Sequence, residues 1–241
     1  VSGDARLRDN APPSVWEKSA IREPEITTGI TEPEVQVERI GIEEDLRVAI
    51  VGAGGFGRVA LDVLLASGSE QWVLGFYDDA HSVLADKVRG FPVLGDIGML
   101  KSMLSVETVH VIVAITDNEA RLRIANSIRA LAGQFITAIH PQAYVSEVAV
   151  VGDGTVVAAG AVVHPDAVVG SHCYVGPGAV IDRDAEVGAG AWVSAGAVVG
   201  SGAKIGARAT LGNNACVGRK ATVAANAKLE ALGHVAEGGS V

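Results

Sequence analysis

Aromatic and sulfur-containing side chains are scarce in this chain of 241 residues: aromatics make up 4% of the sequence, and only two cysteines occur. Cys173 and Cys216 form no CxxC pair, which excludes a disulfide scaffold and a cysteine-based zinc site. No apolar run reaches about 18 residues, and no basic-then-apolar signal opens the sequence, so neither a membrane span nor a secretory signal is predicted. A reducing, cytoplasmic setting is therefore expected.

Basic residues are also in the minority. The 28 acidic residues outnumber the 19 basic ones and give a net charge of −9, which argues against nucleic acid and anionic membranes as the main partners. The chain is rich instead in hydrophobic residues, at 49%, and in glycine, with 30. We therefore expect an aliphatic core and a backbone with many tight turns.

The first 46 residues differ in composition from the rest. They contain four of the eight prolines, and 11 acidic against five basic residues. Because no apolar period is sustained, we expect an acidic, proline-containing N-terminal arm. This arm is either extended and loosely ordered, or it packs on the body or on a neighbouring subunit through Trp16, Ile21, Ile26 and Ile30.

Residues 47–140 alternate between strand and helix patterns. Strands are predicted at 47–52, 72–77, 91–94, 109–115 and 135–139, and helices at 54–67 and 119–132. Such alternation is typical of βαβ units, so we expect a Rossmann-like α/β domain, a parallel sheet with helices on both faces.

Residues 141–231 form an 18-residue repeat built from hexads. Every sixth residue from Val145 to Leu229 is aliphatic, and every sixth residue from Ala149 to Ala227 is small. This period fits neither an α-helix nor strict strand alternation. It fits a coil that turns a corner every six residues, with the aliphatic residue inside and the small residue at the bend.

The repeat therefore predicts a parallel β-helix of five coils over 141–231, followed by a C-terminal tail at 232–241. Its hand is expected to be left, as in known hexapeptide helices.

The combination of GAGGFG, FITAIHPQAYVS and hexapeptide coils over roughly residues 47–231 resembles the sialic acid O-acyltransferase family. That family includes bacterial acetyltransferases acting on UDP-4-amino sugars. The resemblance implies acyl transfer, without a metal, from acetyl-CoA or another acyl-CoA to an amino or hydroxyl group of a nucleotide-linked sugar. It also implies a homotrimer, with CoA between neighbouring β-helices and the nucleotide sugar on the N-terminal domain.

A glycine-rich turn, Gly52–Gly57, follows a predicted strand and opens a helix. Free N–H groups and the helix dipole favour an anion there, although a purely structural turn is the alternative. Asp78 and Asp79 end the second strand, where a carboxylate can bind a ribose or a uracil edge. A nicotinamide dinucleotide is a rival ligand, but no catalytic domain of dehydrogenase type follows.

The resemblance instead implies that a UDP-sugar is the ligand. Family members commonly have histidine at position 56 and glycine at position 116, where this chain has Phe56 and Thr116. The implied contacts are Gly54, Gly55, Phe56, Asp78, Asp79 and Thr116.

The same resemblance assigns the acyl-transfer chemistry to the third coil. The segment Gly178–Ala185 matches the family's catalytic segment, with Arg183 at the position of the catalytic histidine and Asp184 as its acidic neighbour. Arginine stays protonated and cannot serve as an ordinary base. A second family histidine matches Trp192.

Three interpretations remain open. First, a displaced base replaces the histidine: either His164, about 5 Å from Asp182 in the next coil, or His172 on another edge. Second, an already deprotonated amine needs only alignment, while Arg183 binds a phosphate or carboxylate. Third, the chain is an inactive binding or scaffold homologue, and Arg183 and Asp184 are a surface ion pair worth little.

Contacts to acyl-CoA are expected, again from the resemblance, at Trp192, Ser201 and Asn213. Trp192 has a second interpretation, as an aromatic anchor between subunits. Both interpretations predict that Trp192 is buried in the trimer.

Overall fold

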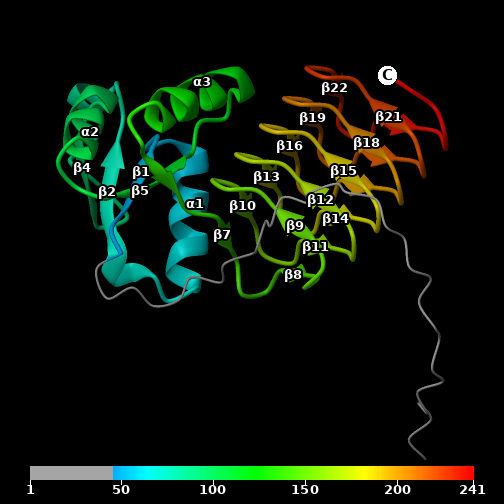
Figure 1. Cartoon of the computed structure of the whole chain (residues 1–241), viewed down its shortest axis with the longest axis horizontal. Helices are drawn as coiled ribbons and strands as arrows, with labels where there is room; N and C mark the ends of the chain where they lie inside the picture. Colours follow the sequence, from blue (N-terminus) through cyan, green and yellow to red (C-terminus); the bar gives the residue numbers. More distant parts are fainter. Residues whose placement is uncertain (1–45) are drawn as a thin grey trace, which may run out of the picture. The chain divides into compact units, whose positions relative to one another are not determined.

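The computed structural model describes residues 46–241 (Figure 1). The arm expected at 1–46 lies, except for its last residue, outside this described part. Within it, no helix is long and apolar enough to cross a membrane.

An α/β domain comes first. Its six-stranded sheet has the order β3-β4-β2-β1-β5-β6 and is parallel except for the β3–β4 pair. The strands are β1 (Val48–Val51), β2 (Val73–Tyr77), β3 (Lys87–Val88), β4 (Phe91–Gly95), β5 (His110–Val113) and β6 (Gln134–Phe135). The helices are α1 (Gly55–Ala66), α2 (Ile97–Leu104) and α3 (Asn118–Arg129), with 3₁₀ turns η1 (Glu70–Trp72) and η2 (His81–Val83).

The two faces of this sheet bury different sets of side chains because successive residues of a strand point to opposite faces. Val48 and Ile50 of β1 belong to the same core as α1. Ala49 and Val51 belong to a second core with α2 and α3. The sequence prediction of a parallel sheet covered on both faces is therefore confirmed.

Seventeen two-residue strands follow and form three parallel sheets, the faces of a prism (Figure 1). The β7 sheet contains β7 (Ala138–Ile139), β10 (Val156–Val157), β13 (Tyr174–Val175), β16 (Trp192–Val193), β19 (Thr210–Leu211) and β22 (Lys228–Leu229). The β8 sheet contains β8 (Tyr144–Val145), β11 (Val162–Val163), β14 (Val180–Ile181), β17 (Val198–Val199), β20 (Cys216–Val217) and β23 (His234–Val235). The β9 sheet contains β9 (Val150–Val151), β12 (Val168–Val169), β15 (Glu186–Val187), β18 (Lys204–Ile205) and β21 (Thr222–Val223).

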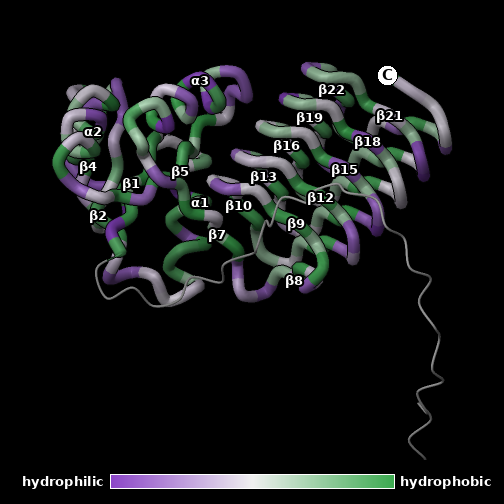
Figure 2. The backbone as a smooth tube through the Cα atoms, in the orientation of Figure 1, coloured by the Kyte–Doolittle hydropathy of each residue, from purple (hydrophilic) through white to green (hydrophobic). Residues whose placement is uncertain are grey.

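The predicted hexad columns form the interior of this β-helix. Val157, Val163 and Val169, one from each sheet, are fully buried, as is the small residue Ala161. Figure 2 shows hydrophobic residues recurring along every coil. Burial of one such valine stabilises the fold by about 2 kcal/mol, and each coil contributes three positions of this kind.

Two kinds of glycine occur at the corners. One column of the repeat has a positive φ at every sixth residue; Gly178, with φ 67°, and Asp184, with φ 60°, belong to it. Gly188 has no such φ; a Cβ there would lie only 2.5 Å from the backbone nitrogen of Ala207 in the next coil. Gly178 therefore serves a left-handed turn, whereas Gly188 allows two coils to approach closely.

Two predicted boundaries differ from the structure. The single strand expected at 135–139 is two strands: β6 completes the α/β sheet and β7 begins the β-helix. The tail expected at 232–241 contains a further strand, β23, because Val235 continues the aliphatic column and is 6% exposed. The sequence analysis also missed α2 and β3.

We expect Gly188→Ala to destabilise the protein by about 2 kcal/mol or more, because the new methyl group meets rigid backbone. The matched control is Gly178→Asn, at a positive φ with nothing within 4 Å of its ideal Cβ. Asn214 adopts the same turn with φ 54°, so we expect this control to stay within about 1 kcal/mol of the wild type. Urea unfolding of both variants measures the difference, and equal losses would contradict the distinction.

Candidate acceptor site and acyl-transfer corner

Several predicted acceptor contacts lie at one edge of the α/β sheet. β1 pairs in parallel with both β2 and β5, so the carboxyl ends of these strands share an edge. Gly54 and Gly55 follow β1 and are exposed at the start of α1, while Asp78 follows β2 and Thr116 follows β5. Free backbone N–H groups at the start of this 12-residue helix are available for an anion.

The two carboxylates of this edge, Asp78 and Asp79, accept hydrogen bonds from backbone N–H groups of the neighbouring loops. Asp78 Oδ2 accepts the N–H of Ala53 at 2.9 Å, and its Oδ1 accepts the N–H of Ala80 at 2.9 Å. Asp79 Oδ1 accepts the N–H of Ile97 at 3.1 Å, at the start of α2. Asp78 therefore shapes the glycine-rich turn, a role that the sequence analysis did not foresee.

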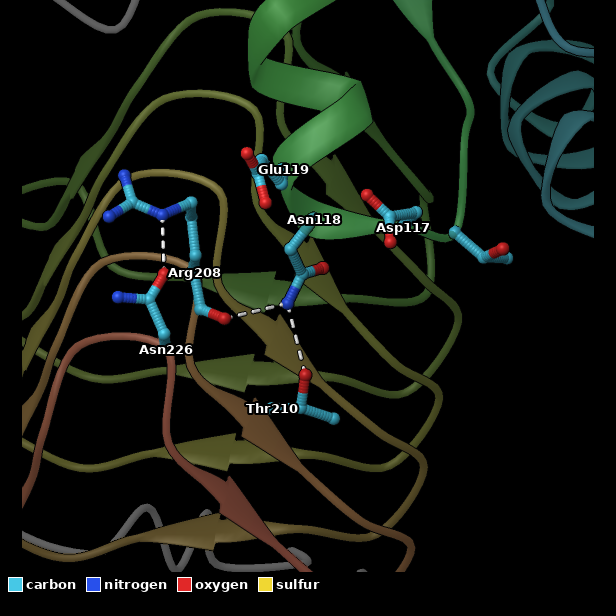
Figure 3. Close-up of a pocket in the computed structure, with 7 residues that line it drawn as sticks. Asp117, Asn118, Glu119, Arg208, Thr210 and Asn226 are labelled. Carbon is cyan, nitrogen blue, oxygen red and sulfur yellow. Dashed lines mark hydrogen bonds between the residues drawn. The ribbon is translucent and has the colours of Figure 1, made fainter.

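A pocket of about 280 Å³ opens beside the start of α3 (Figure 3). Asn118 donates from Nδ2 to the carbonyl oxygen of Arg208 at 2.9 Å and to Thr210 Oγ1 at 3.0 Å. Arg208 Nε in turn donates to Asn226 Oδ1 at 2.6 Å. The lining residues are Thr116, Asp117, Asn118, Glu119, Arg208, Thr210 and Asn226.

Only Thr116 of these lining residues was predicted. Arg208 and Asn226 lie on the corner between the β9 and β7 sheets, which we call the Arg208 corner; it also includes His172 and Gly190. The hexads predict where each corner falls along the chain. They do not predict which corner the α/β domain meets, so the pocket could not be assembled from the sequence.

Arg121 connects the α/β domain to the Arg208 corner. Its side chain is 1% exposed, and it donates to the backbone oxygens of His172 and Gly190 at 2.8 and 2.7 Å. Burial lowers the pKa of Arg121 to about 10, so the guanidinium stays protonated at neutral pH. The sequence analysis named the nearby Thr116 but missed this residue.

Phe56 and Trp192 contact each other inside the chain. Their ring centroids are 4.9 Å apart, and Tyr174 completes the group at 5.0 Å from Phe56 and 4.4 Å from Trp192. The Phe56 side chain is 4% exposed and Trp192 is half-buried. Contacts between α1 and the β7 sheet thus already account for much of the Trp192 burial that was expected from a trimer.

The predicted catalytic residues lie on another edge, the corner between the β8 and β9 sheets, which we call the Arg183 corner. The Arg183 and Asp184 side chains are 67% and 62% exposed, and their Nε–Oδ2 distance is 3.8 Å. Half-buried His164 donates its backbone N–H to the Ile181 oxygen at 2.9 Å, one coil from Asp182. Asp184 also occupies the positive-φ turn column, where aspartate is common for conformational reasons.

The three predicted CoA contacts are not neighbours within one chain. Ser201 lies on the Arg183 corner, Trp192 on the β7 sheet, and Asn213 on the third corner, between β19 and β20. Their contact with CoA stays a prediction.

His172 cannot be the displaced base. Its side chain is 3% exposed, stacks edge-on against Phe135 at 4.5 Å, and lies with Nε2 3.1 Å from Arg129 Nη2. Burial lowers its pKa to about 4, although Asp153 opposes this effect. It is therefore neutral and enclosed within one chain, not available to a neighbouring subunit.

Known proteins share both halves of this architecture. Residues 47–128 match the PglD N-terminal domain, and residues 148–183 and 184–219 match the bacterial transferase hexapeptide repeats. The acetyltransferase domain of PglB from Neisseria gonorrhoeae is 32% identical, with a TM-score of 0.73 over 80% of this chain and 97% of that one. This chain belongs to the sugar acetyltransferase family.

Two further relatives of the family are N-acetyltransferases. A histidine mutant of perosamine N-acetyltransferase from Caulobacter crescentus, in complex with CoA and GDP-perosamine, is 31% identical, with a TM-score of 0.69 over 81% of this chain and 88% of that one. UDP-N-acetylbacillosamine N-acetyltransferase of Bacillus subtilis is 32% identical over 118 residues, 46% of this chain and 51% of the relative. The match thus spans about half the length of that curated relative. These proteins support the prediction of acyl transfer from acyl-CoA to an amino or hydroxyl group of a nucleotide-linked sugar, and of these two acceptors they support the amine.

The burial of His172 makes stability depend on pH. Its pKa falls from an ordinary 6.5 to about 4 on folding, so between these values the unfolded chain binds a proton that the folded chain does not. Stability should therefore decrease as the pH falls from 6.5 to 4, by up to about 3 kcal/mol.

His172→Asn keeps a residue type that tolerates the φ of 56° and should flatten this dependence. Urea unfolding at several pH values between 7 and 4 checks it. A variant with the wild-type pH dependence would show that His172 is not responsible.

Proposed function

We propose that this protein transfers an acyl group, preferably acetyl, from acyl-CoA to the amino group of a nucleotide-linked sugar. One observation carries the proposal: a single chain combines a sheet edge that carries the Gly52–Gly57 turn, a polar pocket beside it, and the hexapeptide coils found in sugar acetyltransferases. The N–H groups around Gly54 and Gly55 would bind the diphosphate. Phe56 would contribute its backbone only, because its side chain is buried.

The pocket suits the sugar. Asp117 and Glu119 supply carboxylates, Asn226 an amide, and Arg208 a guanidinium. This mixture of acceptors and donors matches hydroxyl groups and an amine, and Thr116 connects it to the edge where the nucleotide would lie.

Transfer requires the amine nitrogen to attack the thioester carbonyl carbon. The C–S bond then breaks, CoA leaves as a thiolate that takes up a proton, and the nitrogen gives its proton to a base. We assign the base to His164, because it is the histidine on the Arg183 corner, one coil from Asp182. Arg183 would then bind a phosphate of the donor or acceptor.

We further propose that the protein is a homotrimer. The outward positions of the β8 sheet form an apolar column from β8 to β20, with Tyr144 56% and Val198 37% exposed and with Val162 and Val180 half-buried. The corresponding column of the β9 sheet becomes charged at Glu186. A second copy packed on the β8 sheet would cover the apolar column and place the adjoining Arg183 corner at the interface.

A second candidate function is that of a nucleotide-sugar binder without catalysis. It is favoured by the exposed Arg183, which occupies the position where the family resemblance implies a catalytic histidine. Such a protein would bind the sugar nucleotide and release no CoA.

Acetyl transfer is tested with acetyl-CoA and a panel of UDP- and GDP-linked amino sugars, by following release of the CoA thiol. We expect turnover with at least one acceptor, and His164→Ala should lower kcat by roughly 10²–10⁴-fold, the usual contribution of a general base. Lys87→Ala, at an exposed position on β3 of the α/β domain, is the control.

Unchanged turnover in His164→Ala would contradict the assignment of His164 as the base. If calorimetry detects a sugar nucleotide but no acetyl-CoA, the binding function replaces the enzymatic one.

Val180→Glu is expected to produce monomers, because it places a charge in the apolar column of the β8 sheet. Light scattering after size-exclusion chromatography measures the mass. Val168→Glu on the β9 sheet, where the wild-type side chain is 43% exposed, should remain trimeric. Dissociation by the β9-sheet change alone would assign the interface to the other face.

A further inference from the structure

Arg121 is a buried cation whose interactions are almost all with neutral oxygens. The described residues give it no salt bridge; its Cζ lies 5.6 Å from the centre of the Trp192 ring. Desolvating a guanidinium is costly unless its N–H groups are all bonded. Here Nε, Nη1 and Nη2 each have at least one acceptor within 2.8 Å.

The acceptors belong to two different parts of the chain. His172 and Gly190, which accept from Nε and Nη2, occupy the same position on consecutive coils of the Arg208 corner. Nη1 donates to the carbonyl oxygens of Ile115, at 2.7 Å, and Thr116, at 3.4 Å. One planar group thus ties the loop after β5 to two successive coils of the β-helix.

The connection continues into the pocket through Asn118. Arg121 Nη2 donates to Asn118 Oδ1 at 2.7 Å, which directs the amide nitrogen of Asn118 toward Arg208 O and Thr210 Oγ1 (Figure 3). The two walls of the pocket, one from α3 and one from the β-helix, therefore meet at a side chain whose orientation Arg121 sets.

We propose that Arg121 is a positioning residue for the acceptor site. It determines where the Thr116–Asn118 wall lies relative to the Arg208 corner, and so how tightly the sugar nucleotide is bound. The proposal rests on the proposed function for its kinetic readout, but its structural readout does not require activity.

Arg129 provides a matched control from the same helix. It also connects α3 to the β-helix, through Asp153 Oδ2 at 2.7 Å and His172 Nε2 at 3.1 Å. Among the described residues it contacts Asp153, His172 and Phe135 rather than the loop after β5, and it does not line the pocket. Variants of Arg129 should therefore weaken the packing of α3 on the β-helix. Only variants of Arg121 should also displace the Thr116–Asn118 wall of the pocket.

Arg121→Lys keeps the charge but not the planar fork of donors. We expect it to raise the KM for the nucleotide sugar roughly tenfold, the effect of losing one or two hydrogen bonds, with the KM for acetyl-CoA within about twofold of the wild type. Arg129→Met should leave both KM values near the wild type. If Arg121→Lys fails to fold, Asn118→Ala breaks the same connection while the guanidinium keeps its four backbone acceptors, and it should give the same selective increase.

Hydrogen exchange of the ligand-free proteins gives the second readout. Amides at 115–118 should exchange faster in Arg121→Lys than in the wild type, and at the wild-type rate in Arg129→Met. Equal effects of the two arginine changes on both KM values and on exchange would overturn the proposal. If no acceptor is turned over by the wild type, the proposed function fails, while unchanged exchange at 115–118 in Arg121→Lys would overturn the positioning role separately.

Discussion

The hydrogen-bond ladder between successive coils is the constraint on which the rest of the structure depends. The N–H of the first residue in a strand donates to a carbonyl in the next coil, as Val162 does to Ala179 at 2.8 Å, so residues 18 apart lie in register. Register sorts the sequence into faces and corners. His172, Gly190 and Arg208 consequently follow one another along a single corner, and that corner is where α3 is attached.

Attachment of the α/β domain uses two different interactions. On one side, Phe56 of α1 packs against Tyr174 and Trp192, which replaces water with aromatic surface. On the other side, α3 approaches so closely that a Cβ at Gly190 would lie 2.7 Å from Leu122, and backbone oxygens become acceptors for Arg121. The aromatic packing of Phe56 stabilises the contact between the two domains, while the directional hydrogen bonds of Arg121 fix the position of α3 along the β-helix.

Sequence alone was sufficient for what is periodic or local. The hexads predicted the faces, and the glycine turn and the β-branched runs predicted the order of the α/β domain. The sequence analysis did not predict the pocket, because Asn118 and Arg208 are 90 positions apart and meet only through the packing of two domains. It also offered His172 as a possible base. The hexad pattern does not reveal which corner of the β-helix the α/β domain covers, so it could not show that His172 is enclosed.

The separation of the two candidate sites has a consequence for how an active site can be built. The polar pocket lies at the Arg208 corner, between the β9 and β7 sheets, whereas His164 and Arg183 lie at the corner between the β8 and β9 sheets. The β9 sheet therefore separates the two within one chain. An amine held in the pocket reaches a base at the Arg183 corner most directly if that corner belongs to another copy, so catalysis and assembly would depend on the same apolar column of the β8 sheet. An isolated subunit would then keep the ability to bind the sugar nucleotide while lacking the means to acylate it.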